Sequence, residues 1–114
     1  MPDVYKFNGS EGKPISLEMA REWIKNYQKK NPNSTKVHFF GRDIIERILG
    51  EDGCVGIRIY YASDEKGDGQ LLLVGANSDG NNLLPKSEEL TDNENIIADY
   101  SWPCPSYCPP EGGF

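Results

Sequence analysis

The side chains best suited to chemistry are two cysteines, Cys104 and Cys108, in the proline-rich run WPCPSYCPP. Two thiolates supply half of a zinc site, and Cys54, His38, a carboxylate or a second subunit would supply the other half. Because the flanking prolines restrict the backbone, the same pair also suits a short disulfide loop. Two reduced cysteines in a tail are the plainest alternative. The spacing therefore leaves a zinc site, a disulfide and free thiols open at this pair.

His38 and Cys54 are a second candidate, because a cysteine beside a histidine can act as an acyl-transfer nucleophile. Cys54, however, begins a hydrophobic strand, where a free cysteine usually behaves as a small buried apolar residue. His38 lies between Val37 and Phe39, which is typical of a structural or solvent-facing histidine. The pattern keeps an enzyme with a site near the central strand 54–62 as a third possibility, behind a binding role.

The acidic run SDEKGDG over 63–69 contains part of the pattern of a calcium-binding loop. Lys66 stands where such a loop needs an acid, and Gly75 stands at its last position in place of glutamate. Asp, Asn and Gly tolerate left-handed backbone, so this run instead predicts a turn between two strands.

Four residues form a candidate partner-binding set. Arg58 and Tyr60 share one face of strand 54–62, and Trp102 and Tyr107 lie among the prolines of the tail. Arginine, tryptophan and tyrosine are enriched at binding hot spots, and a proline-rich aromatic segment suits a polyproline-type ligand. We therefore predict that these four residues bind a partner. The alternative for Arg58 and Tyr60 is a face that a helix or the tail covers, and the alternative for Trp102 and Tyr107 is a tail strapped to the protein's own core.

Hydrophobic periodicity predicts the elements that position these residues. Ser16 is a suitable helix N-cap, and the residues after it repeat with helical spacing. The predicted elements are a helix over 16–30, an extended run over 35–40, a helix over 42–49, strands over 54–62 and 70–76, and a short third strand over 82–84. The expected fold class is α+β, with one long and one short helix packed on a small antiparallel sheet of about three strands.

The composition changes after residue 84. Residues 1–84 are predicted to form a single α+β domain with its core in 16–84. Residues 85–114 hold an acidic segment followed by a tail rich in proline, cysteine and aromatic residues. This tail is expected to be an appendage or a wrapping strap.

The charge of the chain excludes some partners. The net charge is −6 over 114 residues, which argues against nucleic acid and against an anionic membrane surface. No basic segment followed by an apolar run opens the chain, and no stretch reaches the length of a membrane span. Three cysteines, an odd number, do not suggest a disulfide framework. A cytoplasmic location is expected.

The runs HFFGRDIIERIL over 38–49 and GCVGIRIYY over 53–61 carry a family resemblance. They resemble a set of small bacterial proteins of the Bacteroidetes type, whose activity is not assigned. The resemblance covers roughly residues 16–84 and implies a bacterial origin, but it implies no catalytic residue.

These observations favour a small, non-enzymatic domain that binds another protein and needs no cofactor. The main alternative is a metal- or disulfide-dependent protein that uses Cys104 and Cys108, with zinc as its metal. The oligomeric state is left open.

Overall fold

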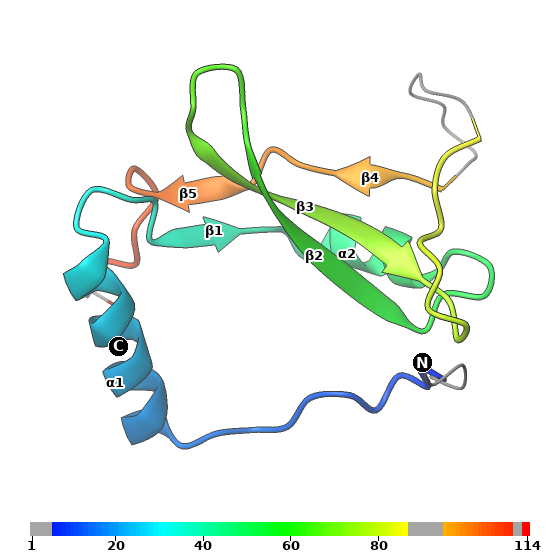
Figure 1. Ribbon diagram of the computed structural model, residues 1–114, viewed down its shortest axis with the longest axis horizontal. Helices are drawn as coiled ribbons and strands as arrows, with labels where there is room; N and C mark the ends of the chain where they lie inside the picture. The colour runs from blue at the N-terminus through cyan, green and yellow to red at the C-terminus, as the bar shows by residue number, and fades with distance from the viewer. Residues whose placement is uncertain (1–5, 87–94, 111–112) are drawn as a thin grey trace.

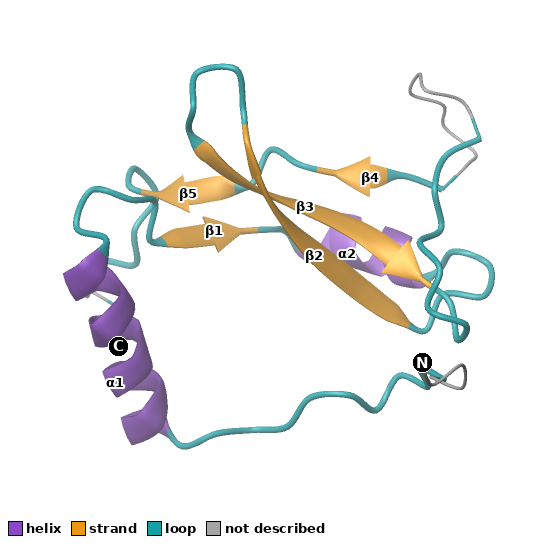
Figure 2. Cartoon of the chain, viewed as in Figure 1, coloured by secondary structure: helices purple, strands orange, loops and turns teal. Residues whose placement is uncertain are grey.

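The computed structural model describes residues 6–86, 95–110 and 113–114 of the chain. Within them it has two helices and two antiparallel sheets, which confirms the predicted α+β class (Figures 1 and 2). The elements are α1 (Leu17–Lys30), β1 (Val37–Phe39), α2 (Arg42–Leu49), β2 (Gly56–Ser63), β3 (Gly69–Ala76), β4 (Ile97–Ala98) and β5 (Trp102–Cys104).

Helix α1 begins and ends where local signals place it. The Ser16 hydroxyl accepts a hydrogen bond from the backbone N–H of Met19 at 3.0 Å, which satisfies one free donor of the first turn. At the other end, Asn31 donates from both its backbone and its side chain to the carbonyl of Tyr27. The helix buries none of its residues, and Figure 1 shows it near the ends of β1 and β5 but set apart from α2 and from strands β2, β3 and β4. Its apolar stripe is therefore largely open.

Strands β2 and β3 form a long hairpin. They pair in register from Gly56 opposite Ala76 to Ser63 opposite Gly69. Asp64 closes the turn between them, because its Oδ1 accepts hydrogen bonds from the backbone N–H groups of Lys66 and Asp68. The predicted turn is confirmed.

The third strand comes from a later part of the chain than expected. Residues 82–84 form only an isolated bridge, between Asn82 and Ala76, because Pro85 follows and cannot donate to a ladder. Strand β4 instead pairs with β3, and β5 pairs with β1 in a second, two-stranded sheet. The tail that follows residue 84 therefore supplies strands to both sheets.

The core lies at one end of the hairpin, under α2. Ile48 is fully buried there and clusters with Leu73, Ile96 and Ala98. Ile57 packs against this cluster, and Ile59 and Tyr61 follow it on the same face of β2. Because α2 is only eight residues long, it covers only the part of this face near Ile57. The rest of the face, toward the tip of the hairpin, is uncovered, and Ile59 is 56% exposed.

Candidate functional site

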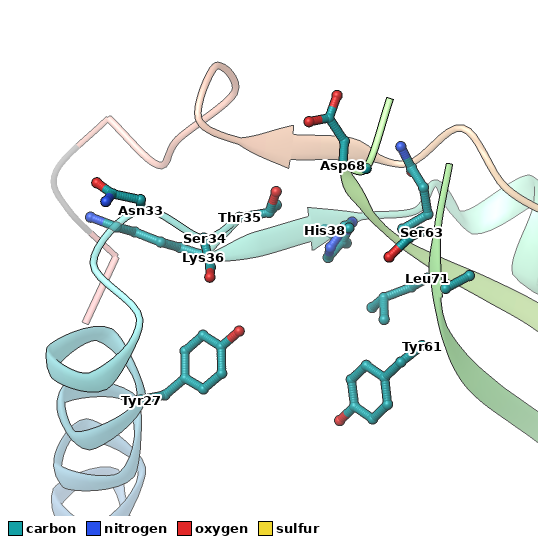
Figure 3. A pocket seen from close by; sticks show the side chains of 14 residues that line it. Tyr27, Asn33, Ser34, Thr35, Lys36, His38, Tyr61, Ser63, Asp68 and Leu71 are labelled. Carbon is teal, nitrogen blue, oxygen red and sulfur yellow. The ribbon is translucent and has the colours of Figure 1, made fainter. Parts of the chain in front are cut away.

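A concavity of about 650 Å³ lies beside the uncovered end of the hairpin. Its lining residues come from the last turn of α1, the loop that follows it, β1 and the hairpin tip (Figure 3). The residues that characterise it are Tyr27, Asn33, Ser34, His38, Tyr61 and Ser63. The surface combines aromatic rings with small polar side chains.

Two tyrosines face the concavity from opposite sides. Tyr27 projects from α1 and Tyr61 from β2, and Figure 3 shows both rings directed into the space between these elements. Tyr27 is 50% exposed and Tyr61 is 92% exposed. Exposed tyrosine is suited to binding, because it presents a large ring of low flexibility together with a hydroxyl group.

His38 lines the same concavity from β1. Its Nδ1 lies 2.8 Å from the Ser101 hydroxyl, a hydrogen bond that fixes the plane of the ring. Within the described part of the chain Nε2 has no hydrogen-bond partner. The imidazole can therefore exchange a hydrogen bond with a bound molecule through this nitrogen.

Cys54, the proposed partner of His38 in catalysis, lies elsewhere. Its thiol donates a hydrogen bond to the carbonyl of Gly56 at 3.2 Å, and its side chain packs against the core cluster. His38 and Cys54 thus have different neighbours, and Cys54 behaves as the small apolar residue that its position in the strand suggests.

Cys104 and Cys108 are joined by a disulfide, with their Cα atoms 4.6 Å apart. Cys104 is buried in β5 opposite Val37, whereas Cys108 is exposed. In this oxidised state the pair has no thiolate to offer zinc. Among the residues that the structure describes, no group of three or more histidine, cysteine, aspartate or glutamate side chains is placed to hold a metal ion.

Arg58 and Tyr60, predicted to bind a partner, are tied into the fold. Arg58 Nη1 donates to the carbonyl of Gly80 at 3.0 Å and to Asn82 Oδ1 at 2.7 Å, and its guanidinium lies over the ring of Phe7. The Tyr60 hydroxyl accepts a hydrogen bond from the Asn82 amide at 2.8 Å. Arg58 therefore anchors the loop after β3, and the binding role of Arg58 and Tyr60 stays a prediction.

Trp102 and Tyr107 stack on each other, with ring centroids 4.7 Å apart. Both remain exposed, and Phe39 lies opposite Trp102 in the β1–β5 pair. The disulfide, the strand pairing and this stacking hold the tail against its own chain. The tail is a strap in this structure, and its exposed aromatic rings remain a predicted partner-binding surface.

Residue types alone did not identify Tyr27 and Tyr61 as site residues. Both belong to apolar stripes, one helical and one of alternating spacing, that normally mark a core. The available signal was the polar run over 31–35, which follows the end of the helix that carries Tyr27 and contributes Asn33, Ser34 and Thr35 to the concavity.

Comparison with protein-family models, curated proteins and solved structures found no match. The resemblance to small bacterial proteins stays a prediction. No helix in the described ranges combines the length and apolar character needed to span a membrane.

Proposed function

We propose that this protein is a non-enzymatic domain that binds another protein through the concavity between α1 and the β2–β3 hairpin. The observation that carries the proposal is the pair of exposed tyrosines, Tyr27 and Tyr61, facing each other among serine, threonine, asparagine and glycine residues. Antibody binding sites share this composition, because tyrosine gives rigid contact area while small polar residues give adaptable hydrogen bonds.

The extent of the exposed surface supports the same proposal. A folded monomer of 12.8 kDa is expected to expose about 6,300 Å², whereas this chain exposes 9397 Å². Its radius of gyration is 16.3 Å, compared with about 13 Å for a compact domain of this length. The extended segment before α1, the open stripe of α1 and the exposed end of β2 all contribute to this excess.

The disulfide indicates the kind of compartment in which the domain functions. Disulfides persist in oxidising compartments and are rare in the cytosol. The Cys104–Cys108 bond therefore favours a non-reducing environment, and the predicted cytoplasmic location would require this pair to be reduced there. It also keeps a disulfide-dependent role as the second candidate, with the bond needed to hold the tail in place.

Capture with matched tyrosine variants tests the proposed surface. The full chain would be immobilised and exposed to a lysate of the organism that encodes it, and separately to a differently tagged copy of itself. We expect Tyr61→Asn to lose a protein that the wild type retains. Tyr100→Asn is the control, because Tyr100 is 91% exposed, does not line the concavity, and has a φ of 62° that asparagine tolerates. Retention of nothing specific, or equal retention by both variants, would refute the proposal.

A further inference from the structure

We infer that the partner is a second copy of this chain, added edge to edge along β2. The inference rests on the proposed function and names its partner. Strand β2 pairs with β3 over its whole length. On its other side, no described residue forms a backbone hydrogen bond with Gly56–Ser63. The outer N–H and C=O groups of β2 are therefore a free template for another strand.

Strand β2 lacks the features that normally protect a sheet edge. Natural edge strands are short, or carry proline, lysine or an inward-facing charge. The sequence GIRIYYAS contains no proline, lysine or acidic residue. Its single charge, on Arg58, is held by Gly80 and Asn82. Ile59, Tyr60 and Tyr61 are all exposed, so the free edge is long and mostly apolar.

The other free edges among the described strands are shorter. Strand β4 has two residues and pairs only with Leu73 and Val74, so among the described residues the outer side of β3 is open from Gly69 to Leu72, and β1 and β5 have three residues each. Tyr100, with its positive φ of 62°, separates β4 from β5 and marks where the chain leaves β3 to pair with β1. Proline 103 further protects β5. The structure thus leaves β2 as the long edge on which a strand can be added.

A second copy fits this edge by symmetry. Two antiparallel copies of one strand are related by a two-fold axis perpendicular to the sheet, which gives a closed pair with no free β2 edge. The registers centred on Ile59 and on Tyr60 keep most of β2 paired. In the first, Tyr61 lies opposite Ile57 of the second copy, and in the second it lies opposite Ile59. Aromatic residues opposite β-branched residues are stabilising cross-strand pairs, so both registers cover the most exposed tyrosine of the concavity.

The size of a stable interface also favours a folded copy over a short peptide. A standard interface buries about 800 Å² on each partner, and obligate homodimers bury far more. A single added peptide strand would cover only this edge, whereas a second copy also brings its own exposed Ile59 and Tyr61 to it.

The first test is the molar mass of the full, oxidised chain by light scattering or sedimentation over a range of concentrations. We expect twice the monomer mass of 12.8 kDa. Tyr61→Lys places a charge from each copy near the axis and should return the mass to that of a monomer. Tyr100→Lys, at an equally exposed tyrosine away from β2, should remain a dimer.

Cross-linking provides a second readout that does not depend on a disruptive variant. In a Cys54→Ala background, either Ile59→Cys or Tyr60→Cys should form a disulfide-linked dimer on mild oxidation, depending on which residue lies at the axis. Tyr100→Cys should not. A monomer at every concentration overturns the inference. A dimer also overturns it if Tyr61→Lys leaves the dimer intact and neither Ile59→Cys nor Tyr60→Cys cross-links it. If the monomeric chain still captures a different protein through Tyr61, only the self-association fails; if it captures nothing, the proposed function fails as well.

Discussion

Gly75 lies at a tightly packed point of the fold, where β3 passes under α2. A Cβ atom at this position would lie 3.0 Å from Cys54 Sγ, 3.0 Å from Glu51 Oε1 and 3.3 Å from Ile48 Cγ2. None of these groups can move freely. The Cys54 thiol donates a hydrogen bond to the carbonyl of Gly56. The Glu51 carboxylate accepts a 3.0 Å hydrogen bond at Oε2 from the backbone N–H of Ile96, and Ile48 is fully buried. We therefore expect Gly75→Ala to destabilise the protein by overpacking.

The size of the effect follows from two opposing terms. Overpacking a close-packed core costs about 1–3 kcal/mol, whereas replacing glycine by alanine within a strand returns about 0.5–1 kcal/mol. The net loss for Gly75→Ala should be about 1–2 kcal/mol, or a decrease in melting temperature of about 4 °C per kcal/mol for a chain of this size. Urea unfolding followed by circular dichroism measures the loss, at one protein concentration because self-association also stabilises the folded state.

The matched control is Gly69→Ala in the same strand. A Cβ atom at Gly69 meets nothing within 4 Å, so this variant should be as stable as the wild type or slightly more stable. In a Cys54→Ala background, the cost of Gly75→Ala should fall by at least about 0.5 kcal/mol, as expected for residues in contact. Equal stability of the two glycine variants, or no dependence on Cys54, would refute the packing described around Gly75.

Two further predictions concern the tail and the hairpin turn. Cys108→Ser opens a loop with a sequence separation of 4, which should lower the free energy of unfolding by about 2 kcal/mol; a variant whose urea midpoint equals that of the oxidised wild type would contradict this. Hydrogen bonds from the Gln70 side chain and from the backbone N–H of Asp68 lower the pKa of Asp64. Ionised Asp64 should therefore stabilise the turn at pH values above its unfolded pKa of about 3.9, and this contribution should be lost as the pH falls through the lower folded pKa. The protection factor of the Asp68 amide, which is the exchange rate corrected for the intrinsic effect of pH, checks this prediction, and in Asp64→Asn the protection factor should no longer depend on pH over this range.

The elements that depend on local signals could be predicted from the sequence. The predicted helix over 16–30 is observed as Leu17–Lys30, because the Ser16 cap and the Asn31 stop act within one turn. Alternation likewise predicted β2 and β3 to within about two residues. The third strand was wrongly placed at 82–84. Strand β4 has only two residues, which is too short to show an alternating pattern, and its pairing with β3 joins parts of the chain that are distant in sequence.

The candidate site was harder to predict. Its residues are accessible only because no other described element of the chain packs on them. Arg58 and Tyr60 were selected by residue type, yet their hydrogen-bond partners lie more than twenty residues away along the chain. Tyr61 lies on the same apolar face of β2 as Ile57, and only the short length of α2 leaves it exposed. Local spacing cannot show where a covering helix ends.

Apolar spacing indicates which face of an element is to be buried, but it does not indicate which chain will bury it. Ile48 of α2 meets its own sheet and is fully buried. The stripe of α1, and the Ile59 and Tyr61 end of β2, carry the same kind of pattern and remain exposed. Because Tyr27 and Tyr61 line one concavity, the two open faces border the same space. The second copy that we propose along the β2 edge would lie beside these open faces, so we expect its binding to bury apolar surface that the chain leaves exposed by itself.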